Sequence, residues 1–486
     1  MNSADTSQNK IEPYVWRIAG VVILGMIMSI LDTTIVNVAL DTLARDLHTT
    51  LSDIQWVATG YLLSLAAVIP LTGWAARKYG AKQVYIASIV LFTLGSALCG
   101  IADSSGSLIA FRVLQGIGGG MIMPIGQMIM AEVAGPKRMG KVMSVTVMPA
   151  MLAPILGPVL GGLILQDLHW SWIFFVNIPV GIVAVTLAVK LLPHSKLGEA
   201  GMLDLVGLAL MVLGIPALVF GISEVGTTGS VTSPEVIWPV IAGLALIAAF
   251  VWHALRTERP LLDVRLYANR IFGAASMTTF ALGAALFGAM ILMPLYYQQV
   301  RDESVITTGF LLAPQGLGML MVAPFAPRLT ERFGGGKVAT FGVLVLCLSS
   351  LPFVFIGVDT SILFLSIMLL LRGAGIGFAF MPTMTVAYAS LRKDQLSDAT
   401  PQMNVIQRVG GAIGTAVLAV VLQQAGEGAT NVNQAADAFG TAYLWALGIA
   451  MLALIPCIIL WRAEKPDVPE SRDQAIAEAE IEPLGA

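Results

Sequence analysis

One acidic residue stands inside an apolar stretch near the N-terminus. Asp32 lies within residues 18–40, which are apolar and long enough to cross a bilayer as a helix. An ionised carboxylate there costs about 2.5–3.5 kcal/mol on insertion scales, so intramembrane acids are rare and usually functional. Such a carboxyl group can take up a proton on one side of a membrane and release it on the other. The alternative is a structural role, in which Asp32 bonds to Thr33, Thr34 or Asn37.

A basic residue in a later apolar stretch is the natural partner of this acid. Arg112 opens an Arg-Val-Leu-Gln-Gly run that includes Gln115 and Gly116. A buried guanidinium stays charged and requires an anionic partner. The two stretches cross the membrane in opposite directions, and Asp32 and Arg112 both fall in the outer half. We therefore expect Arg112 to lower the proton affinity of Asp32 while the two are close; the alternative is a static ion pair.

The composition defines the class of protein. The chain has 486 residues, of which 57% are hydrophobic and 12% charged, whereas soluble domains carry about 25% charged residues. Its three cysteines, Cys99, Cys347 and Cys457, lie in apolar segments and form no disulfide or metal framework. No phosphate-binding loop and no nucleophile–base set is evident. The sequence predicts a polytopic membrane protein that is not an enzyme, uses no ATP, metal or organic cofactor, and binds no nucleic acid; the proton is its coupling ion.

Fourteen apolar segments predict an all-α fold with fourteen transmembrane helices. They span residues 16–40, 54–75, 83–101, 107–130, 141–165, 171–192, 203–222, 236–255, 271–298, 305–326, 337–357, 361–389, 403–424 and 440–461.

The distribution of the 27 lysine and arginine residues gives the orientation. Outside the predicted spans nearly all of them lie at the two ends of the chain and in alternate loops, and the opposite loops hold only Arg45 and Arg301. Basic loops stay in the cytoplasm. Both termini are therefore predicted to be cytoplasmic.

Two pairs of segments repeat within the chain. Residues 73–82 and 327–337 share a basic, aromatic, Gly, then Lys pattern, and the Arg112 segment resembles the segment that begins at Arg372. Two related halves are the plan of alternating-access transporters. The predicted divisions are a tail at 1–15, six-helix halves at 16–192 and 271–461, two inserted helices within 193–270, and a polar tail at 462–486.

These motifs resemble the major facilitator superfamily, and within it the fourteen-span drug:proton antiporter branch typified by EmrB and QacA. Residues 31–40, Leu-Asp-Thr-Thr-Ile-Val-Asn-Val-Ala-Leu, match the branch signature of the first span. The resemblance implies a major facilitator fold and a role for Asp32 in proton coupling. The family pattern continues with Pro where this chain has Asp41, a departure expected to affect the end of the helix.

The loop at residues 73–82 matches the superfamily loop in part. Gly73, Gly80, Lys78 and Lys82 keep the family pattern, but Arg77 occupies the position of an Asp that helps to latch neighbouring helices in the outward-facing state. The resemblance implies a gating role for these five residues and leaves the latch itself in doubt. The alternative is that the loop serves as an orientation signal only.

Small residues and prolines mark two further spans. Residues 149–162 resemble an antiporter motif associated with exporters, and residues 410–414 carry a Gly-Gly-x-x-Gly run. Small residues at these spacings let helices approach closely. The resemblance implies a conformational role; ordinary packing is the alternative. The residues concerned are Pro149, Pro154, Gly157, Pro158, Gly161, Gly162, Gly410, Gly411 and Gly414. The aromatic stretch 170–181 is interpreted as an interfacial anchor.

The sequence thus predicts a secondary active exporter in the cytoplasmic membrane of a bacterium. It exchanges inward protons for outward amphiphilic small molecules, and lipid surrounds it. One intramembrane acid against three arginines favours neutral, zwitterionic or anionic substrates. Arg408 lies in the cytoplasmic third of its span, and snorkelling toward the cytoplasm is one interpretation of it. Arg372, deep in its span, is the better cavity candidate. Predicted polar contacts to substrate are Asn37, Gln115, Gln298, Gln299, Gln315, Arg372 and Gln407.

Alternatives remain at this point. One is a dedicated exporter of a single metabolite, antibiotic or lipid, which a broad substrate panel distinguishes. Another is a non-transporting membrane scaffold or sensor, which would tolerate loss of Asp32. A periplasmic adaptor, which EmrB-like proteins of double-membrane bacteria require, is not indicated because the outer loops are short.

Overall fold

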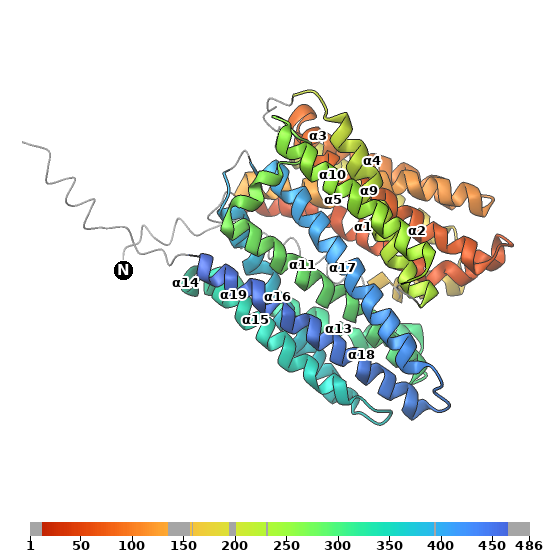
Figure 1. Cartoon of the computed structure of the whole chain (residues 1–486). Coiled ribbons are helices and arrows are strands. Elements are labelled where there is room, and N and C mark those ends of the chain that lie inside the picture. Colours follow the sequence, from red (N-terminus) through yellow and green to blue (C-terminus); the bar gives the residue numbers. More distant parts are fainter. Residues whose placement is uncertain are drawn as a thin grey trace, which may run out of the picture.

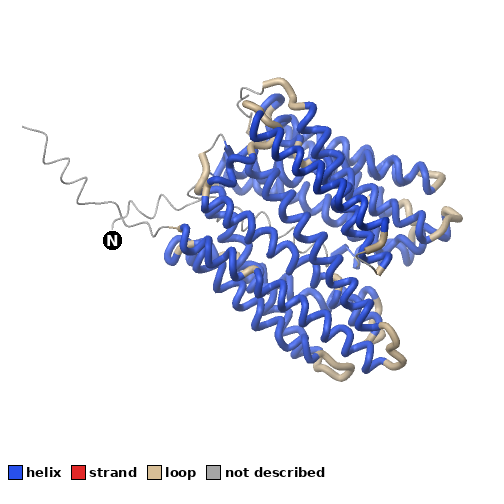
Figure 2. The backbone as a smooth tube through the Cα atoms, viewed as in Figure 1, coloured by secondary structure: helices blue, strands red, loops and turns tan. Residues whose placement is uncertain are grey.

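The computed structural model describes residues 12–134, 156–157, 159–193, 201–229, 232–392 and 395–464. Every regular element in these ranges is a helix, as Figures 1 and 2 show. The predicted all-α fold class is confirmed.

The N-terminal helices pack around one central helix. They are α1 (Pro13–Asp46), α2 (Leu51–Val68), α3 (Leu71–Tyr79), α4 (Ala81–Gly100), α5 (Ser105–Ala134), a helical stretch at 159–167, α7 (Trp172–Phe175) and α8 (Asn177–Leu191). Helix α5 contacts α1, α2 and α4. Helix α1 continues past the predicted end at Leu40 as far as Asp46, and Asp41, unlike a proline, keeps the backbone N–H group that a helix interior uses.

The C-terminal helices form a second bundle. They are α11 (Arg270–Met290), α12 (Leu292–Gln299), α13 (Val305–Val322), α14 (Ala326–Phe333), α15 (Gly335–Ser350), η3 (Leu351–Phe355), α16 (Ile362–Ala389), α17 (Leu396–Gly426), α18 (Val432–Leu452) and α19 (Leu454–Ala463). Helix α11 packs on α16 and α17, and α16 packs on α13 and α15.

Two long helices follow the first bundle in the sequence, and the first of them contacts both bundles. Helices α9 (Leu205–Thr228) and α10 (Pro234–Arg256) precede the short η2 (Val264–Ala268). Helix α9 packs against α2 of the first bundle and α17 of the second, and Phe220 stacks on Trp56 at 5.6 Å between ring centroids. Helix α9 therefore lies against both bundles at their junction, and α10 packs on α9 (Figure 1).

Asp204 ties α9 to α10 and to the linker that follows. Its carboxylate accepts from the backbone N–H groups of Gly207 (2.8 Å) and Leu261 (3.1 Å), and it bonds to His253 Nε2 (2.8 Å). Burial alone would raise the pKa of Asp204, but these hydrogen bonds outweigh it and lower that pKa. The Asp204 carboxylate, which caps the N-terminus of α9, is therefore ionised at neutral pH.

The number of candidate spans agrees with the sequence as far as the structure reaches. Eleven described helices are long and apolar enough to cross a membrane, and thirteen are if each of two bent pairs is one span. These thirteen match every predicted span except 141–165, which lies largely outside the described residues. The total of fourteen stays a prediction.

The predicted internal repeat has a matching local structure. The α2–α3 pair bends by 57° and the α13–α14 pair by 48°. Each pair ends at a glycine of nearly the same conformation, Gly80 with φ 88° and ψ 138° and Gly334 with φ 88° and ψ 147°. A side chain is strained at positive φ, so both loops require glycine.

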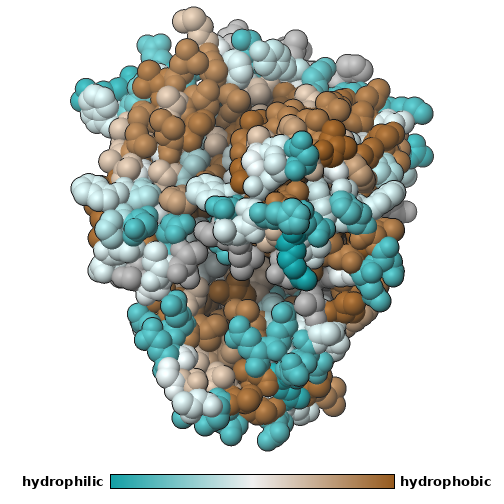
Figure 3. Space-filling view, turned by 90° about the vertical axis from the view of Figure 1, so that its right-hand side faces the viewer, coloured by the Kyte–Doolittle hydropathy of each residue, from teal (hydrophilic) through white to brown (hydrophobic). Residues whose placement is uncertain are grey.

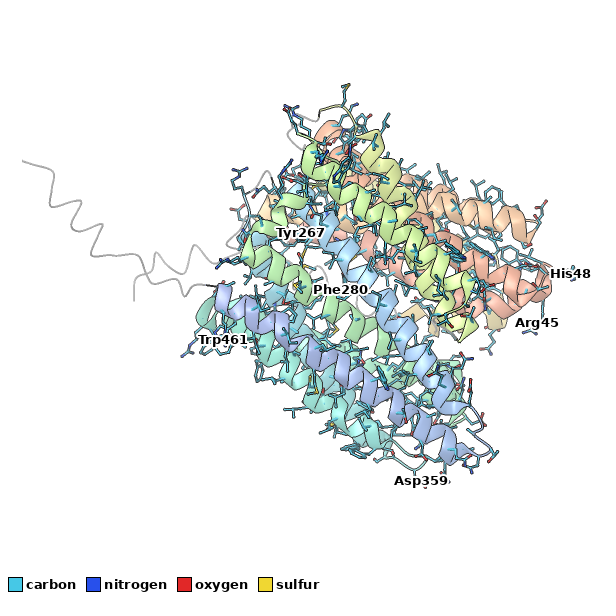
Figure 4. All side chains as sticks on the ribbon, viewed as in Figure 1. Arg45, His48, Tyr267, Phe280, Asp359 and Trp461 are labelled. Atoms are coloured by element: carbon cyan, nitrogen blue, oxygen red, sulfur yellow. The ribbon has the colours of Figure 1, made fainter. Side chains whose placement is uncertain are left out.

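The two bundles meet at one end and diverge at the other (Figure 1). We call the end where α3 contacts α17 the closed end, and the end that carries Arg45, His48 and Asp359 the open end. Figure 4 shows Arg45 and His48 on one bundle, far from Asp359 on the other. The open end faces the viewer in Figure 3, which shows polar residues around its rim and a hollow between the bundles.

Large apolar side chains cover much of the outer surface. Trp238, Phe310 and Leu363 are 70%, 65% and 71% exposed. Water would disfavour such a surface, whereas the hydrocarbon core of a bilayer covers it. The structure is thus that of a multi-pass membrane protein.

Candidate functional site

Glycines in α5 bring its polar residues against the neighbouring helices. A Cβ atom at Gly116 would lie 2.6 Å from the Tyr61 carbonyl oxygen in α2, and one at Gly118 would lie 2.8 Å from the Ser88 carbonyl oxygen in α4. Only glycine permits backbones to approach so closely. The packing sets the distance from Arg112 to its partners on other helices.

Asp32 lies at the centre of a buried network of hydrogen-bond donors. Arg112 Nη1 is 2.5 Å from Asp32 Oδ2, and the two side chains are 1% and 0% exposed. Gln115 Nε2 and Asn177 Nδ2 each donate to Asp32 Oδ1 at 2.9 Å. The contact expected between Asp32 and Arg112 is therefore present. Three donors and one positive charge make this a site for an ionised carboxylate.

Arg112 has further partners that do not depend on the charge of Asp32. Its Nη1 donates to Gln115 Oε1 at 2.8 Å, and its Nε donates to the Val57 carbonyl oxygen at 3.2 Å. The guanidinium carbon lies 4.0 Å from the centroid of the Tyr61 ring. A cation over an aromatic face is stabilised without an acid. Arg112 can thus stay in place when Asp32 is neutral.

Asn177 is a site residue that the sequence analysis missed. It begins α8, where its Nδ2 also donates to Ser96 Oγ at 3.0 Å, and Ser96 Oγ donates to the Phe174 carbonyl oxygen at 2.9 Å. The stretch 170–181 was interpreted as an interfacial anchor. The sequence feature that could have identified Asn177 is its position inside an otherwise apolar span, because a buried amide needs hydrogen-bond partners.

The second bundle holds an arginine in a different setting. Arg372 is 2% exposed, and it donates from Nη1 to Gln315 Oε1 at 3.0 Å and from Nη2 to the Ala285 carbonyl oxygen at 3.4 Å. Its Nε has no hydrogen-bond partner. Across the described residues Arg372 forms no ion pair. Arg372 and Gln315, both predicted to contact substrate, are therefore bonded to each other.

The other predicted polar contacts lie apart from Asp32. Gln407 is buried where α17 packs on α11. Asn37 is exposed on α1, and Gln298 and Gln299 are exposed at the end of α12. The described part of the structure gives none of these four a hydrogen bond to Asp32. Their contact with substrate stays a prediction.

The glycines of α17 lie directly on α11, as their spacing predicts. A Cβ atom at Gly414 would lie 2.6 Å from Ala284 Cα, and Gly410 lies against the Phe280 carbonyl oxygen. A Cβ atom added at Gly411 would lie 2.8 Å from the Phe287 ring. Any larger side chain would push α17, which contacts both bundles, away from α11.

The described part of the span-5 motif lies beside α1, just after Asp32. Gly157 faces the Thr34 side chain. A Cβ atom added at Gly161 would lie 3.4 Å from Ile35, and one added at Gly162 would lie 3.3 Å from Ile306 of the other bundle. The remaining motif residues, Pro149, Pro154 and Pro158, lie outside the described residues.

Contacts between the bundles join them at the closed end. Arg77 Nη1 donates to Asp398 Oδ1 and to Ser397 Oγ, both at 2.8 Å. Deeper in the junction, Asn404 Nδ2 donates to Gln127 Oε1 at 2.9 Å. We call the Arg77–Asp398 ion pair the closed-end latch. Sequence reasoning missed Asp398 because its partner lies in another bundle.

The other residues of the 73–82 loop support this end in different ways. Gly73 lies against the Ser397 carbonyl oxygen, so a side chain there would separate α3 from α17. Lys82 Nζ donates to the carbonyl oxygens of Val189 (2.8 Å) and Leu192 (2.7 Å) at the end of α8. Lys78 is exposed and lies 4.7 Å from the centroid of the Trp74 ring.

Reversing one charge of the closed-end latch is expected to open this end. Arg77→Asp would place two acids together, and because the pair is 25% and 19% exposed we expect a shift of about 1 kcal/mol, roughly fivefold in population. Spin labels at exposed positions 79 and 333 would report the distance between the bundles. The double variant Arg77→Asp/Asp398→Arg should restore the short distance.

The neighbouring Lys78→Asp is the matched control for this experiment. Lys78 contacts aromatic rings and forms no ion pair with a described residue. An equal opening in Lys78→Asp, or no recovery in the double variant, would mean that the ion pair does not hold the bundles together.

Two helical bundles with internally repeated features, joined at one end and holding a buried carboxylate–guanidinium pair, define a secondary-transporter architecture. The chain belongs to the Major Facilitator Superfamily, because the model of that family matches residues 22–415. The resemblance found in the motifs is thereby confirmed.

Several bacterial relatives share most of this chain. It is 40% identical over 410 residues to the "Multidrug resistance protein B homolog" of Mycobacterium tuberculosis, covering 84% of this chain and 76% of the relative. It is 31% identical to the "Multidrug export protein EmrB" of Haemophilus influenzae, covering 81% and 78%. It is 30% identical to the "Putative multidrug resistance protein MdtD" of Salmonella paratyphi B, covering 91% and 93%.

Solved structures share the fold. The human organic anion transporter MFSD10 superposes with a TM-score of 0.64 at 16% identity, covering 92% of this chain and 100% of that one. The proton:xylose symporter XylE gives a TM-score of 0.64 at 14% identity, covering 92% and 95%. At these identities the likeness shows the fold alone.

Proposed function

We propose that this protein is a proton-coupled exporter of amphiphilic small molecules in the cytoplasmic membrane of a bacterium, rather than an enzyme. The observation that carries the proposal is the fully buried Asp32 carboxylate, held by Arg112, Gln115 and Asn177 within the first span. The names of the bacterial relatives support multidrug efflux as the transport function.

The site suits a group that alternates between charged and neutral forms. Ionised Asp32 is stabilised by the Arg112 charge and two amide donors. A proton on Asp32 removes the charge attraction, and Arg112 keeps Gln115, Val57 and the Tyr61 ring as partners. Protonation therefore weakens the link between α1 and α5 without leaving Arg112 unbonded. This is how proton uptake can change the packing of these helices.

The positive-inside rule assigns the closed end to the cytoplasm. Arg77 and Lys78 lie in the last turn of α3, and Arg392 lies in the loop after α16, all at that end. Both termini would then be cytoplasmic. The closed-end latch and the Asn404–Gln127 bond would hold the transporter in its outward-facing state. Asp32 is 0% exposed in this state, so proton exchange requires helix movement.

Proton-coupled export is tested with purified protein in liposomes. An internal pH-sensitive dye would report proton movement when members of a substrate panel, including a lipophilic dye and a neutral antibiotic, are added under an imposed pH gradient. We expect substrate movement against its own gradient, coupled to opposite proton flow. Substrate movement without proton flow would refute the coupling.

A dedicated exporter of one metabolite, antibiotic or lipid is the second candidate. The same panel separates the two functions, because transport of one compound alone indicates a dedicated exporter. Neither candidate calls for a partner protein, and surrounding lipid suffices to cover the apolar surface.

A further inference from the structure

We propose that Arg408 is the binding site for an anionic group of the transported substrate. Arg408 lies in α17 about 12 residues from the helix start, or about 18 Å along the axis. It is partly exposed and makes no hydrogen bond or ion pair with any residue that the structure describes. A guanidinium keeps its charge, and charges inside a membrane protein are normally paired. The inference rests on the proposed transport function and names its substrate class.

The helix faces of α17 place Arg408 at the junction of the bundles. Gly410 and Gly414 face α11, whereas Val409 and Ile413 pack on the apolar cluster of α9. Arg408 follows Asn404 by four residues, so the two share a face, and Asn404 bonds to Gln127 of the first bundle. Arg408 therefore lies on the face of α17 that meets the first bundle.

No acid among the described residues forms an ion pair with Arg408. Asp32 is paired with Arg112, and Arg372 already lacks an acidic partner. The junction therefore holds more positive than negative charge. An amphiphile with a carboxylate would supply the missing anion, and the planar guanidinium can bind both carboxylate oxygens at once.

Binding of a matched pair of aromatic compounds tests this site without requiring transport. 2-Naphthoate carries a carboxylate at neutral pH, and 2-naphthamide has nearly the same shape without the charge. A ligand that binds the folded state raises its unfolding temperature. We expect half-saturation of this stabilisation at a concentration about tenfold lower for naphthoate than for naphthamide, the factor expected for one charged hydrogen-bonded contact.

Two substitutions at the same position supply the controls. Arg408→Gln should remove the preference for naphthoate, and Arg408→Lys should retain most of it. Arg408→Gln breaks no bond to a described residue, so it should fold as the wild type does. Arg256→Gln is the matched control, because Arg256 is exposed at the end of α10, where it lies over the Trp252 ring; it should keep the preference.

The outcomes separate this inference from the proposed function. Equal binding of naphthoate and naphthamide by the wild type, or an unchanged preference in Arg408→Gln, would overturn the anion site even if proton-coupled transport is observed. A preference that Arg408→Gln abolishes would support the site even if the transport panel shows no proton coupling. A preference lost equally in Arg256→Gln would reduce the effect to general positive charge and overturn the assignment.

Discussion

Asp32→Asn is expected to reduce gradient-driven transport to the level of protein-free liposomes. Asparagine has nearly the same volume as aspartate but cannot take up and release a proton. Arg112 would keep its bonds to Gln115 and Val57 and its place over the Tyr61 ring, so the variant retains the surroundings of the site. The measurement is substrate-dependent proton flux in liposomes.

Substrate exchange without a pH gradient is the control for Asp32→Asn. This exchange needs alternating access but no net proton transfer, so it should persist in the variant. Asp103→Asn, in an exposed loop at the open end, should leave both activities unchanged. Full gradient-driven transport by Asp32→Asn would place the coupling proton on another group.

Arg112→Gln is expected to cause a large loss of stability, about 3–5 kcal/mol, because it leaves the buried Asp32 carboxylate without a counter-charge. Asp32 would keep only the amide donors Gln115 and Asn177 among its described partners. Thermal unfolding of the purified variant measures the loss.

The double variant Asp32→Asn/Arg112→Gln should recover most of this stability, because both charges are gone. Arg408→Gln is the matched control, since it removes an intramembrane arginine that has no ion-pair partner in the described part of the chain; its stability should change little. Equal losses in Arg112→Gln and in the double variant would show that shape, and not charge, accounts for the effect.

Much of the architecture follows from the linear pattern of residues. Apolar length predicted the helices, and the glycine-containing loops at 73–82 and 327–337 predicted the repeat that appears as two similar bends ending at Gly80 and Gly334. Asp41, which stands where the resemblance implies a proline, was expected to affect the end of the first helix. The structure shows that α1 continues to Asp46, an end that the sequence did not predict. Local rules suffice here because these features depend on neighbouring residues only.

The site could be predicted in part. A carboxylate and a guanidinium are each costly to bury alone, so the sequence predicts that two such groups in neighbouring spans pair with each other. Asp32 and Arg112 were paired correctly on this ground. Asn177 was missed because an amide can satisfy its hydrogen bonds in many places. Asn37, Gln298 and Gln299 were predicted from their polarity to contact substrate; they are exposed on α1 and α12, and that contact stays a prediction.

The sequence by itself determined the spans, the repeat and the one costly charge pair, because hydrophobic length and charge burial act on each segment separately. Only the tertiary structure decided that Asn177, 145 residues away, completes the Asp32 site and that Arg77 pairs with Asp398, 321 residues away. Only the fold likewise left Arg408 without an acidic partner in the described part of the chain. Helix periodicity defines the face on which a residue lies, but which helix covers that face depends on the packing of the whole chain.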